Sequence, residues 1–205
     1  MSKLTLTTFL TLDGVMQAPG GPPEDTSGGF SHGGWLVPYF DAEMAKFMSE
    51  VFERVDAFLL GRGTYEIFAG HWPRVTDPQD PIASRLNRLP KHVVSKTLDR
   101  VEWHNSWLVR DVVGEVAELK RRYRGELQVH GSAGLAQTLI EHDLVDEYNL
   151  LFFPIVLGSG KRLFGNGAVP AALELQGSRT TNTGVIMASY RRAGRPKYGS
   201  FMLDS

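Results

Sequence analysis

The chain has 205 residues, which is enough for one domain with a substantial core. Hydrophobic residues make up 42% and charged residues 22%, a composition typical of a globular domain and not of a disordered one. The formal net charge is −1, so no general basic field exists to hold a polyanion, and we expect no nucleic-acid partner.

Cysteine is absent, which excludes disulfides, thiolate zinc sites and cysteine nucleophiles. After Met1, Ser2 and Lys3 the chain passes directly into alternating leucine and threonine, without the apolar core of a signal peptide. No run approaches about 18 apolar residues, so we expect no membrane span. These features together predict a cytoplasmic globular protein.

The first part of the chain is predicted to contain a strand, a long loop and a helix. Residues 3–12 alternate at period two and are rich in β-formers, which predicts the strand. Residues 15–40 hold glycine pairs among few apolar residues, which predicts a long mobile loop. A helix follows, with Asp41 as its N-cap. Its apolar face consists of Met44, Phe47, Met48, Val51 and Phe52.

The middle of the chain alternates short apolar runs with helical patterns. A strand over 57–60, buried on both faces, ends at Gly61 and leads to a short helix over 64–68. Residues 70–81 are rich in proline and aspartate and are predicted to form a loop. The elements predicted after this loop are helical turns over 82–89, strands over 92–95 and 107–109, a helix over 111–123, a strand over 127–130 and a helix over 133–142.

A long apolar strand over 145–155 and a hairpin over 173–181 and 185–192 complete the pattern. Strands that alternate with helices indicate crossover connections and a largely parallel sheet covered on both faces. The predicted fold class is therefore α/β: a three-layer α/β/α arrangement around a mostly parallel mixed sheet, with a C-terminal antiparallel hairpin. We expect residues 1–205 to form a single domain.

Two predicted strand-to-helix junctions have the composition of phosphate-binding turns. The first is Gly61-Arg-Gly-Thr-Tyr65, and the second is His130-Gly-Ser-Ala-Gly134. Each combines glycine with a hydroxyl, Thr64 or Ser132, that we expect to cap the helix. The N–H groups at such helix starts bind phosphate well, and two of these turns in one domain suit a dinucleotide. Ordinary turns have the same composition, so either junction alone is equally consistent with a purely structural role.

Cations near the first junction favour a phosphorylated ribose. Arg62 lies inside the turn, and Ser95-Lys96-Thr97 ends the next predicted strand. Arginine with serine and lysine is a donor set for a ribose 2′-phosphate, whereas an acidic residue there would select a free hydroxyl. Taken alone, Lys96 is better explained as a solvated lysine at a strand end.

Several competing motifs are incomplete. Glu66 stands where the third glycine of a Rossmann fingerprint belongs, and Gly158-Ser-Gly-Lys161 lacks both the first glycine and the final hydroxyl of a P-loop. Ser132 is not centred in Gly-x-Ser-x-Gly, which disfavours a hydrolase. The six histidines show no spacing suited to metal ligation, so we expect no metal.

With these residues assembled, the sequence resembles the dihydrofolate-reductase-like superfamily, in the branch that contains the reductase domain of bacterial riboflavin biosynthesis. The resemblance is carried by an ordered set of segments that spans about residues 4–165. They are Leu10–Gly14, Leu59–Tyr65, Val94–Leu98, Val129–Leu135, Leu144–Tyr148 and Phe153–Gly160. The resemblance implies a reductase that uses NADPH and acts on a small heterocyclic, pterin- or pyrimidine-like, or carbonyl substrate.

The resemblance also implies roles for individual residues. Gly61, Arg62 and Thr64 would hold the adenosine and pyrophosphate side of NADPH, and Ser95 and Lys96 would flank its 2′-phosphate. Asp13, Gly14 and the loop after them, residues 15–40, would border the nicotinamide, and the loop would act as a lid. The pyrophosphate would be wrapped by Gly131, Ser132, Ala133, Gly134 and Leu135.

The proton for reduction has three candidate donors, which the sequence does not rank: Asp13, Asp41 and His130. His130 matches a position that faces substrate in the riboflavin branch, where an acidic residue is usual, and it is equally a strand-end histidine bonded to backbone. Asp41 is the carboxylate nearest to the first helix, where true dihydrofolate reductases bind the pteridine, and it is equally an N-cap.

Two other functions and one assembly are compatible with the same residues. The chain could be a non-catalytic nucleotide- or pterin-binding module of the same fold, or a flavin- or deazaflavin-linked protein. The strand over 144–155 and the apolar C-terminal hairpin could supply the face of a homodimer.

Overall fold

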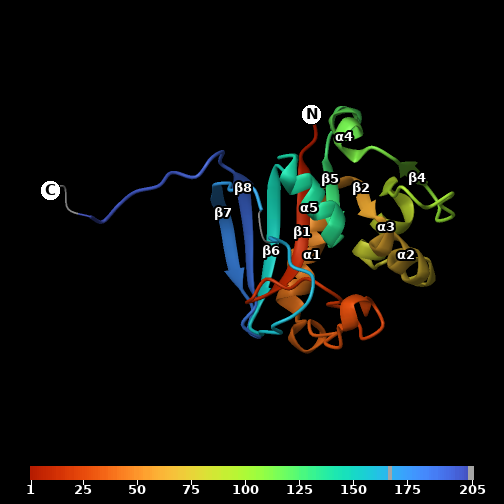
Figure 1. Ribbon diagram of the computed structural model, residues 1–205. Coiled ribbons are helices and arrows are strands. Elements are labelled where there is room, and N and C mark those ends of the chain that lie inside the picture. The colour runs from red at the N-terminus through yellow and green to blue at the C-terminus, as the bar shows by residue number, and fades with distance from the viewer. Residues whose placement is uncertain (166–167, 203–205) are drawn as a thin grey trace.

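The computed structural model describes residues 1–165 and 168–202. These residues form eight strands, five α-helices and three short 3₁₀-helices (Figure 1). The strands are β1 (Leu4–Thr11), β2 (Val55–Gly61), β3 (Lys91–Val94), β4 (Ser106–Val109), β5 (Glu126–His130), β6 (Glu147–Phe153), β7 (Leu173–Thr180) and β8 (Ile186–Arg192). The helices are α1 (Ala42–Glu53), α2 (Arg62–His71), α3 (Pro81–Arg88), α4 (Val112–Arg122) and α5 (Ala133–Glu141). The 3₁₀-helices are η1 (Ser27–Gly29), η2 (Val37–Tyr39) and η3 (Trp72–Arg74).

The eight strands form one mixed sheet in the order β4-β3-β2-β5-β1-β6-β8-β7. The first six strands in this order pair in parallel, and β8 and β7 add an antiparallel hairpin at the end. This arrangement confirms the predicted α/β class, the mostly parallel sheet and the C-terminal hairpin.

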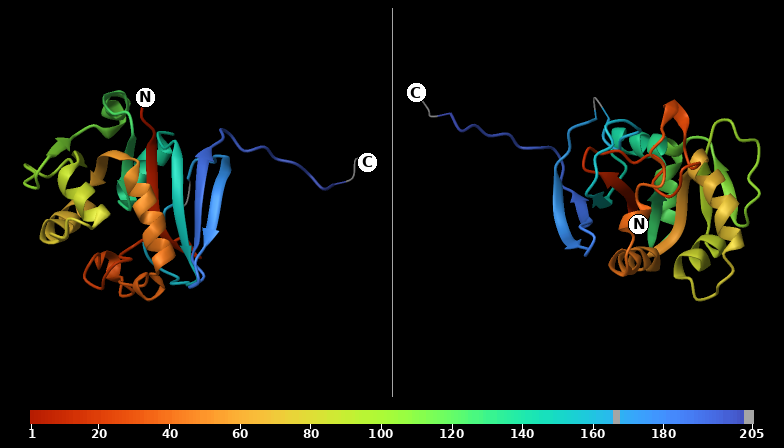
Figure 2. Two further views of the ribbon diagram at one scale, coloured as in Figure 1. Left: turned by 180° about the vertical axis from the view of Figure 1, so that it is seen from behind. Right: turned by 90° about the horizontal axis from the view of Figure 1, so that it is seen from below.

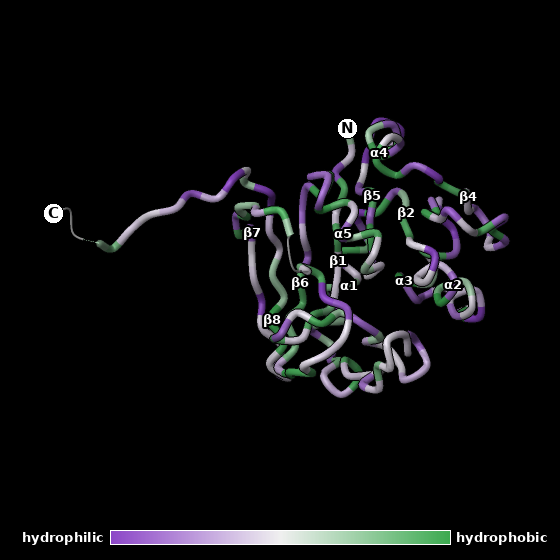
Figure 3. The backbone as a smooth tube through the Cα atoms, viewed as in Figure 1, coloured by the Kyte–Doolittle hydropathy of each residue, from purple (hydrophilic) through white to green (hydrophobic). Residues whose placement is uncertain are grey.

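Helices cover both faces of the sheet and enclose two hydrophobic cores (Figure 2). Apolar residues of α1, α2 and α3 pack into one core, and those of α4 and α5 pack into the other. Figure 3 shows the hydrophobic runs gathered in the sheet and hydrophilic runs along the outer loops. Within the described ranges, no helix combines the length and the apolar composition needed to cross a membrane.

Aspartate side chains start three of the helices. Asp41 accepts a hydrogen bond from the Met44 N–H at the start of α1, and Asp111 accepts one from the Gly114 N–H at the start of α4. Asp80, which the sequence reading did not single out, accepts from Ile82 and Ala83 at the start of α3. Each carboxylate satisfies amide donors that have no partner inside the helix.

Strand β1 lies in the middle of the sheet and is buried on both faces. Its leucines face the core of α4 and α5, as the alternating pattern predicts. Its threonines are buried as well, and Thr5 and Thr7 bond to Glu126 and Asn149 on the neighbouring strands β5 and β6. A row of satisfied polar side chains therefore crosses the sheet beneath α1.

Three predicted boundaries differ from the structure. The helix expected over 64–68 is α2, which runs to His71 and continues into η3, so the predicted loop over 70–81 starts later. Phe68, Ala69 and Trp72 pack against the core, and this burial extends the helix beyond its local signals. The strand expected over 145–155 is β6, which is shorter because Pro154 cannot continue the ladder.

The segment 15–40 is anchored more firmly than its glycine content predicts. Phe30 and Trp35 are buried in the core, and the Trp35 indole donates to the Gln17 carbonyl at 2.8 Å. A Cβ on Gly33 would lie 2.6 Å from the Gly21 carbonyl oxygen, so a glycine is required where the loop crosses itself. Action of this segment as a lid stays a prediction.

Candidate cofactor and active site

Four neighbouring parallel strands bring the candidate residues to one edge of the sheet. In the order β3, β2, β5 and β1, the ends of these strands carry Ser95, Gly61, His130 and Asp13. Parallel strands end at the same edge, here called the carboxyl edge, and ligands of open α/β sheets bind there.

The two predicted phosphate-binding turns touch each other at this edge. The Gly61 N–H donates to the Ser132 hydroxyl at 3.1 Å, and that hydroxyl donates to Thr64 Oγ1 at 2.8 Å. A Cβ on Gly61 would lie 3.3 Å from the Ser132 Cβ, so glycine permits this close approach. These two hydrogen bonds link the end of β2 to the end of β5, directly beside the starts of α2 and α5.

Ser132 occupies the predicted N-cap position of α5 and Thr64 does not occupy that of α2, and the prediction that their hydroxyls bond to the first amides of these helices is wrong. Gly61 occupies the N-cap position of α2, and neither α2 nor α5 has a side-chain cap. Ser132 occupies the N-cap position of α5 in the left-handed conformation (φ 58°, ψ 61°), which turns its hydroxyl toward Gly61 and Thr64. The hydroxyls therefore fix the two turns to each other.

This arrangement leaves the first amide donors of α2 and α5 without a side-chain acceptor. A Cβ on Gly63 or Gly134 would meet no atom within 4 Å, so open space lies beside these turns. The adjoining positions Ala133 and Leu135 are more covered, and Leu135 is buried. Uncapped N–H groups next to open space are the donor set that phosphate requires.

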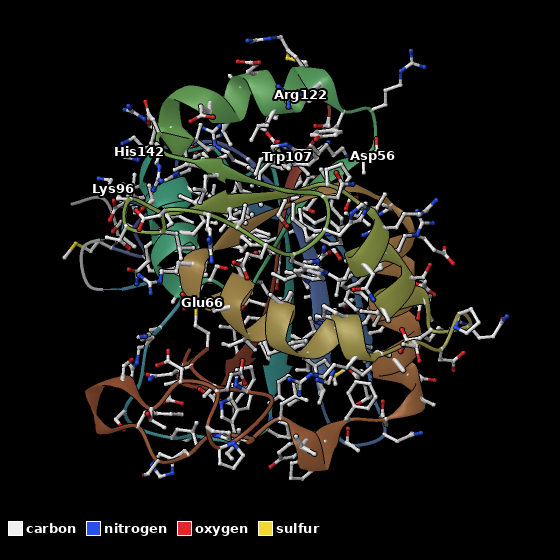
Figure 4. The ribbon with its side chains drawn as sticks, turned by 90° about the vertical axis from the view of Figure 1, so that its right-hand side faces the viewer. Asp56, Glu66, Lys96, Trp107, Arg122 and His142 are labelled. Carbon is white, nitrogen blue, oxygen red and sulfur yellow. The ribbon has the colours of Figure 1, made fainter. Side chains whose placement is uncertain are left out.

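Arg62 connects the start of α2 to the turn after β3. Its guanidinium donates to Thr97 Oγ1 at 2.9 Å and to Glu66 at 2.8 Å. Figure 4 labels Glu66 and Lys96, and both side chains are exposed. The cations expected at a 2′-phosphate, Arg62 and Lys96, therefore lie at one corner of the carboxyl edge. This corner, which consists of Arg62 and the turn Ser95–Leu98 after β3, is called the Arg62 corner.

Arg110, a residue that the sequence reading missed, fastens this corner. Its guanidinium donates to the carbonyls of Ser95 and Leu98 at 2.7 and 2.6 Å. The Ser95 hydroxyl accepts from the N–H groups of Thr97 and Leu98, so it shapes the turn. The position of Arg110 just after β4 gives no local signal, because its partners lie 12 and 15 residues away.

Asp13 lies at the centre of a network that joins the end of β1 to the segment after β6. Its carboxylate accepts from the Thr11 hydroxyl at 2.6 Å and from the Gly158 N–H at 2.8 Å, and Arg162 lies 3.3 Å away. The bond from the Thr11 hydroxyl is the main cause that lowers the pKa of Asp13. The glycine-rich turn Gly158–Lys161 thus binds a carboxylate of the chain itself. Gly14, with φ +80°, has open space where a Cβ would point.

Asp41 caps α1 and also reaches the hairpin turn between β7 and β8. Its carboxylate accepts from the Met44 N–H at 2.9 Å and from the Thr183 hydroxyl at 3.2 Å. The bond from the Met44 N–H is the main cause that lowers the pKa of Asp41. These contacts describe an ionised cap, and a proton-donor role for Asp41 stays a prediction.

We expect Asp41→Asn to keep the melting temperature and any reductase turnover, because the amide oxygen still accepts from Met44. Asp41→Ala removes the cap and is expected to lower the melting temperature by about 2–4 °C. Thermal unfolding and turnover assays on both variants check this. Lost turnover in a normally stable Asp41→Asn protein would assign Asp41 to proton transfer instead.

His130 is buried at the end of β5 between two aromatic side chains. Its ring stacks on Phe52 of α1 with centroids 4.6 Å apart and lies 5.9 Å from the Phe58 ring. Burial lowers the pKa of His130 to about 3, so the imidazole is neutral near pH 7. The backbone-bonded alternative is not what the structure shows, since the Nε2 partner is the side chain of Gln128 at 3.0 Å.

The contacts of Gln128 fix the tautomer of His130. The Gln128 amide nitrogen donates to the Val51 carbonyl and to Glu126, each at 2.7 Å, so the amide oxygen is the acceptor that faces His130. His130 Nε2 therefore carries the proton, and Nδ1 is left as an acceptor. Gln128 is a second residue that sequence reading missed; it lies two residues before His130 on the same strand face.

Within residues 1–165 and 168–202, no group of three or more histidine, aspartate or glutamate side chains is placed to hold a metal ion.

The family model for the RibD C-terminal domain matches residues 2–187. This chain belongs to the RibD C-terminal domain family. The match includes both contacting turns, the Arg62 corner and the Asp13 network, so it covers every candidate site residue named above.

Relatives of this RibD C-terminal domain protein include the uncharacterized protein YyaP of Bacillus subtilis (strain 168). It is 25% identical over 194 residues, which cover 94% of this chain and 96% of YyaP. A riboflavin biosynthesis protein from Shewanella sp. PV-4 superposes with a TM-score of 0.70 at 23% identity, over 93% of this chain and 99% of that one.

The fold also matches that of dihydrofolate reductase. The Enterococcus faecalis enzyme, complexed with NADP(H), superposes with a TM-score of 0.61 at 13% identity, over 93% of this chain and 96% of that one. The dihydrofolate-reductase-like fold expected from the sequence is thereby confirmed.

Proposed function

We propose that this protein is an NADPH-dependent oxidoreductase that reduces a small heterocyclic or carbonyl substrate. The observation that carries the proposal is the contact between the two uncapped helix starts, with Arg62 and Lys96 at the adjoining corner. A dinucleotide with a 2′-phosphate presents anionic groups that such a surface can satisfy. Membership in the RibD C-terminal domain family supports this proposal.

The residues present fit NADPH by their chemistry. The first amides of α2, from Arg62 to Thr64, and those of α5, from Ser132 to Leu135, would hold the pyrophosphate, while Gly61 and Gly131, whose N–H groups donate to Ser132 and Thr7, would shape the two turns. Arg62, Ser95 and Lys96 would meet the 2′-phosphate, and Asp13 and Gly14 would border the nicotinamide. When bound, the nicotinamide supplies the hydride. The E. faecalis dihydrofolate reductase, which has the same fold, is complexed with NADP(H), and this supports the choice of cofactor.

The family resemblance puts His130 on the substrate side, and its protonation state would make it a hydrogen-bond acceptor there. Its neutral ring offers Nδ1, while Gln128 occupies Nε2. A substrate with an N–H or O–H donor would match this acceptor. Asp13 and Asp41 are held as ionised anchors by their own networks, so we propose that the proton for reduction comes from water or substrate.

A second candidate is a nucleotide- or pterin-binding module without turnover. The observation that favours it is that all three candidate proton donors are committed to other contacts or kept neutral. A flavin- or deazaflavin-linked role stays a further alternative. The lack of cysteine fits a reducing compartment, and we propose that the protein acts in the cytoplasm.

Turnover distinguishes these candidates. Purified protein with NADPH should be tested against pterin, pyrimidine, carbonyl and oxidised flavin substrates while nicotinamide absorbance is followed. Steady loss of absorbance with a pterin, pyrimidine or carbonyl supports the reductase. Saturable NADPH binding without turnover of any substrate supports the module, and turnover with flavin alone supports the flavin-linked role.

A further inference from the structure

A surface groove of about 1440 Å³ lies between α2, α3 and the segment that connects β3 to β4. None of the candidate cofactor residues lines it. Its apolar part includes Tyr65, Leu98 and Trp103. The Tyr65 hydroxyl accepts from the N–H groups of Glu102 and Trp103, and the Lys91 ammonium lies 4.4 Å from the Trp103 ring centroid. The apolar floor is therefore fixed in place by specific contacts.

The rim of this groove is acidic. Four carboxylates line it, on Glu66, Asp77, Asp99 and Glu102, together with the guanidinium of Arg100, and Glu66 also pairs with Arg62 at 2.8 Å. Arg100 pairs with Glu102 at 2.8 Å, and that pair is largely exposed. The groove thus combines an aromatic floor with a net negative rim, which suits a segment with both basic and apolar side chains. We refer to it as the acidic groove.

The C-terminal tail of the chain has that composition. The strand pairing of the hairpin ends where Ala172 donates to the Gly194 carbonyl, and the tail begins at Arg195. It carries two cations, Arg195 and Lys197. It also carries Tyr198, Phe201 and Met202, each more than 80% exposed. Three large apolar side chains in one short segment are thus almost fully solvated, which is unfavourable unless a partner covers them.

The tail extends away from the body of the molecule (Figures 1 and 2). Among the described residues from Arg195 to Met202, the one hydrogen bond is internal, from the Met202 N–H to the Ser200 hydroxyl. Figure 3 shows the hydrophilic start of the tail where it leaves β8. The conformation therefore leaves every side chain of the described tail free for a partner, Pro196 being the least exposed.

The tail cannot place its apolar residues in the acidic groove of its own chain. β3 and β4 stand five and six strands from β8 in the sheet order, which is about 24–29 Å at ordinary strand spacing. When fully extended, the chain from Gly194 spans at most about 14 Å to Tyr198, about 25 Å to Phe201 and about 29 Å to Met202, so only its last described residues could match this separation, and only along a straight line. The direct line crosses the sheet, and a path around the helices is longer. A groove on another molecule is the accessible one.

We propose that the C-terminal tail of one copy of this chain binds in the acidic groove of a second copy. Arg195 and Lys197 meet the carboxylate rim, and the apolar residues of the tail pack against the accessible apolar lining of the groove, which is Pro73, Val75, Pro78 and Leu98. Two copies that exchange tails in this way form a closed dimer with two equivalent contacts. This contact does not depend on NADPH binding.

The test uses a chain that ends at Gly194 and a synthetic peptide of residues 193–205. The shortened chain keeps the hairpin pairing and frees the groove. We expect saturable binding of the peptide by calorimetry, and at least about a tenfold loss when Asp99 and Glu102 are changed to lysine. Changing Arg195 and Lys197 of the peptide to glutamate should restore binding to that charge-reversed chain. Glu115→Lys with Glu118→Lys, an acidic pair on α4, is the matched control and should bind like the shortened chain.

Sedimentation velocity over a concentration series completes the test. The full chain should associate to dimers, and the chain that ends at Gly194 should stay monomeric. Absence of peptide binding would overturn the proposal, as would equal binding to the charge-reversed groove. A full chain that stays monomeric while the peptide binds would overturn the assignment to a second copy.

Discussion

The His130→Phe protein is expected to lose stability less steeply than the wild type as the pH falls from about 6.5 to about 4. Burial lowers the pKa of His130 from 6.5 to about 3 in the folded state. The unfolded chain binds this proton near pH 6.5 and the folded chain does not, so the unfolded state gains protons first. The contribution of neutral His130 to the free energy of unfolding is therefore fully present above about pH 6.5 and decreases as the pH falls toward about 3.

The expected size of this effect is about 1.4 kcal/mol per pH unit for one histidine. His92 adds a similar slope down to about pH 4, because burial and then the charge of Arg122 lower its pKa to about 4. Phenylalanine keeps the stack on Phe52 but leaves the Gln128 oxygen without its donor, which costs about 1–3 kcal/mol at neutral pH. The slopes of the two proteins are compared, and not their absolute stabilities.

Urea unfolding at a series of pH values measures these slopes. His104→Gln is the matched control, because it removes an exposed imidazole and should unfold with the wild-type slope. If the free energies of unfolding of His130→Phe and the wild type fall in parallel with pH, the assignment of His130 as a buried, neutral imidazole is wrong.

Replacing Arg62 with alanine is expected to weaken NADPH binding by about 10- to 100-fold and to leave NADH binding nearly unchanged. Charge-assisted hydrogen bonds to a phosphate contribute about 1.5–3 kcal/mol, and only NADPH carries the 2′-phosphate. The fold should tolerate the change, because the bonds of Arg62 to Glu66 and Thr97 are exposed.

Titration of both nucleotides into Arg62→Ala and the wild type gives the ratio of affinities. Arg121→Ala, which removes an exposed arginine from α4, is the control and should bind both nucleotides like the wild type. An equal loss for NADPH and NADH would place Arg62 at a part that the two nucleotides share, and the 2′-phosphate assignment would fail.

The fold was largely predictable because its signals are local. Alternation in β1, apolar runs in β2 and β6, and the N-cap Asp41 are each encoded within a few residues. The order of the candidate segments along the chain then indicated one edge of a parallel sheet. The prediction was weakest where packing extends an element. In α2, Phe68 and Ala69 pack against the core, and this packing extends the helix to His71, beyond its local sequence signals.

The site was predictable in its residue types and less so in their contacts. Ser132 and Thr64 have the composition of caps, but their hydroxyls bond to each other across 68 residues of chain. The bonds of Arg110 to the turn after β3 are equally non-local. The tautomer of His130 depends on two other acceptors of Gln128, one of them on α1. These hydrogen-bond partners and this tautomer depend on the tertiary structure, and the local sequence carries no signal for them.

The central claim is that the two contacting turns and the Arg62 corner form an NADPH site. Titrating NADPH and NADH against the intrinsic fluorescence of the four tryptophans tests this claim most directly. The account predicts saturable NADPH binding at submillimolar concentration, at least about tenfold tighter than NADH binding. Failure of both nucleotides to bind below about millimolar concentration, or equal affinity for the two, would contradict it.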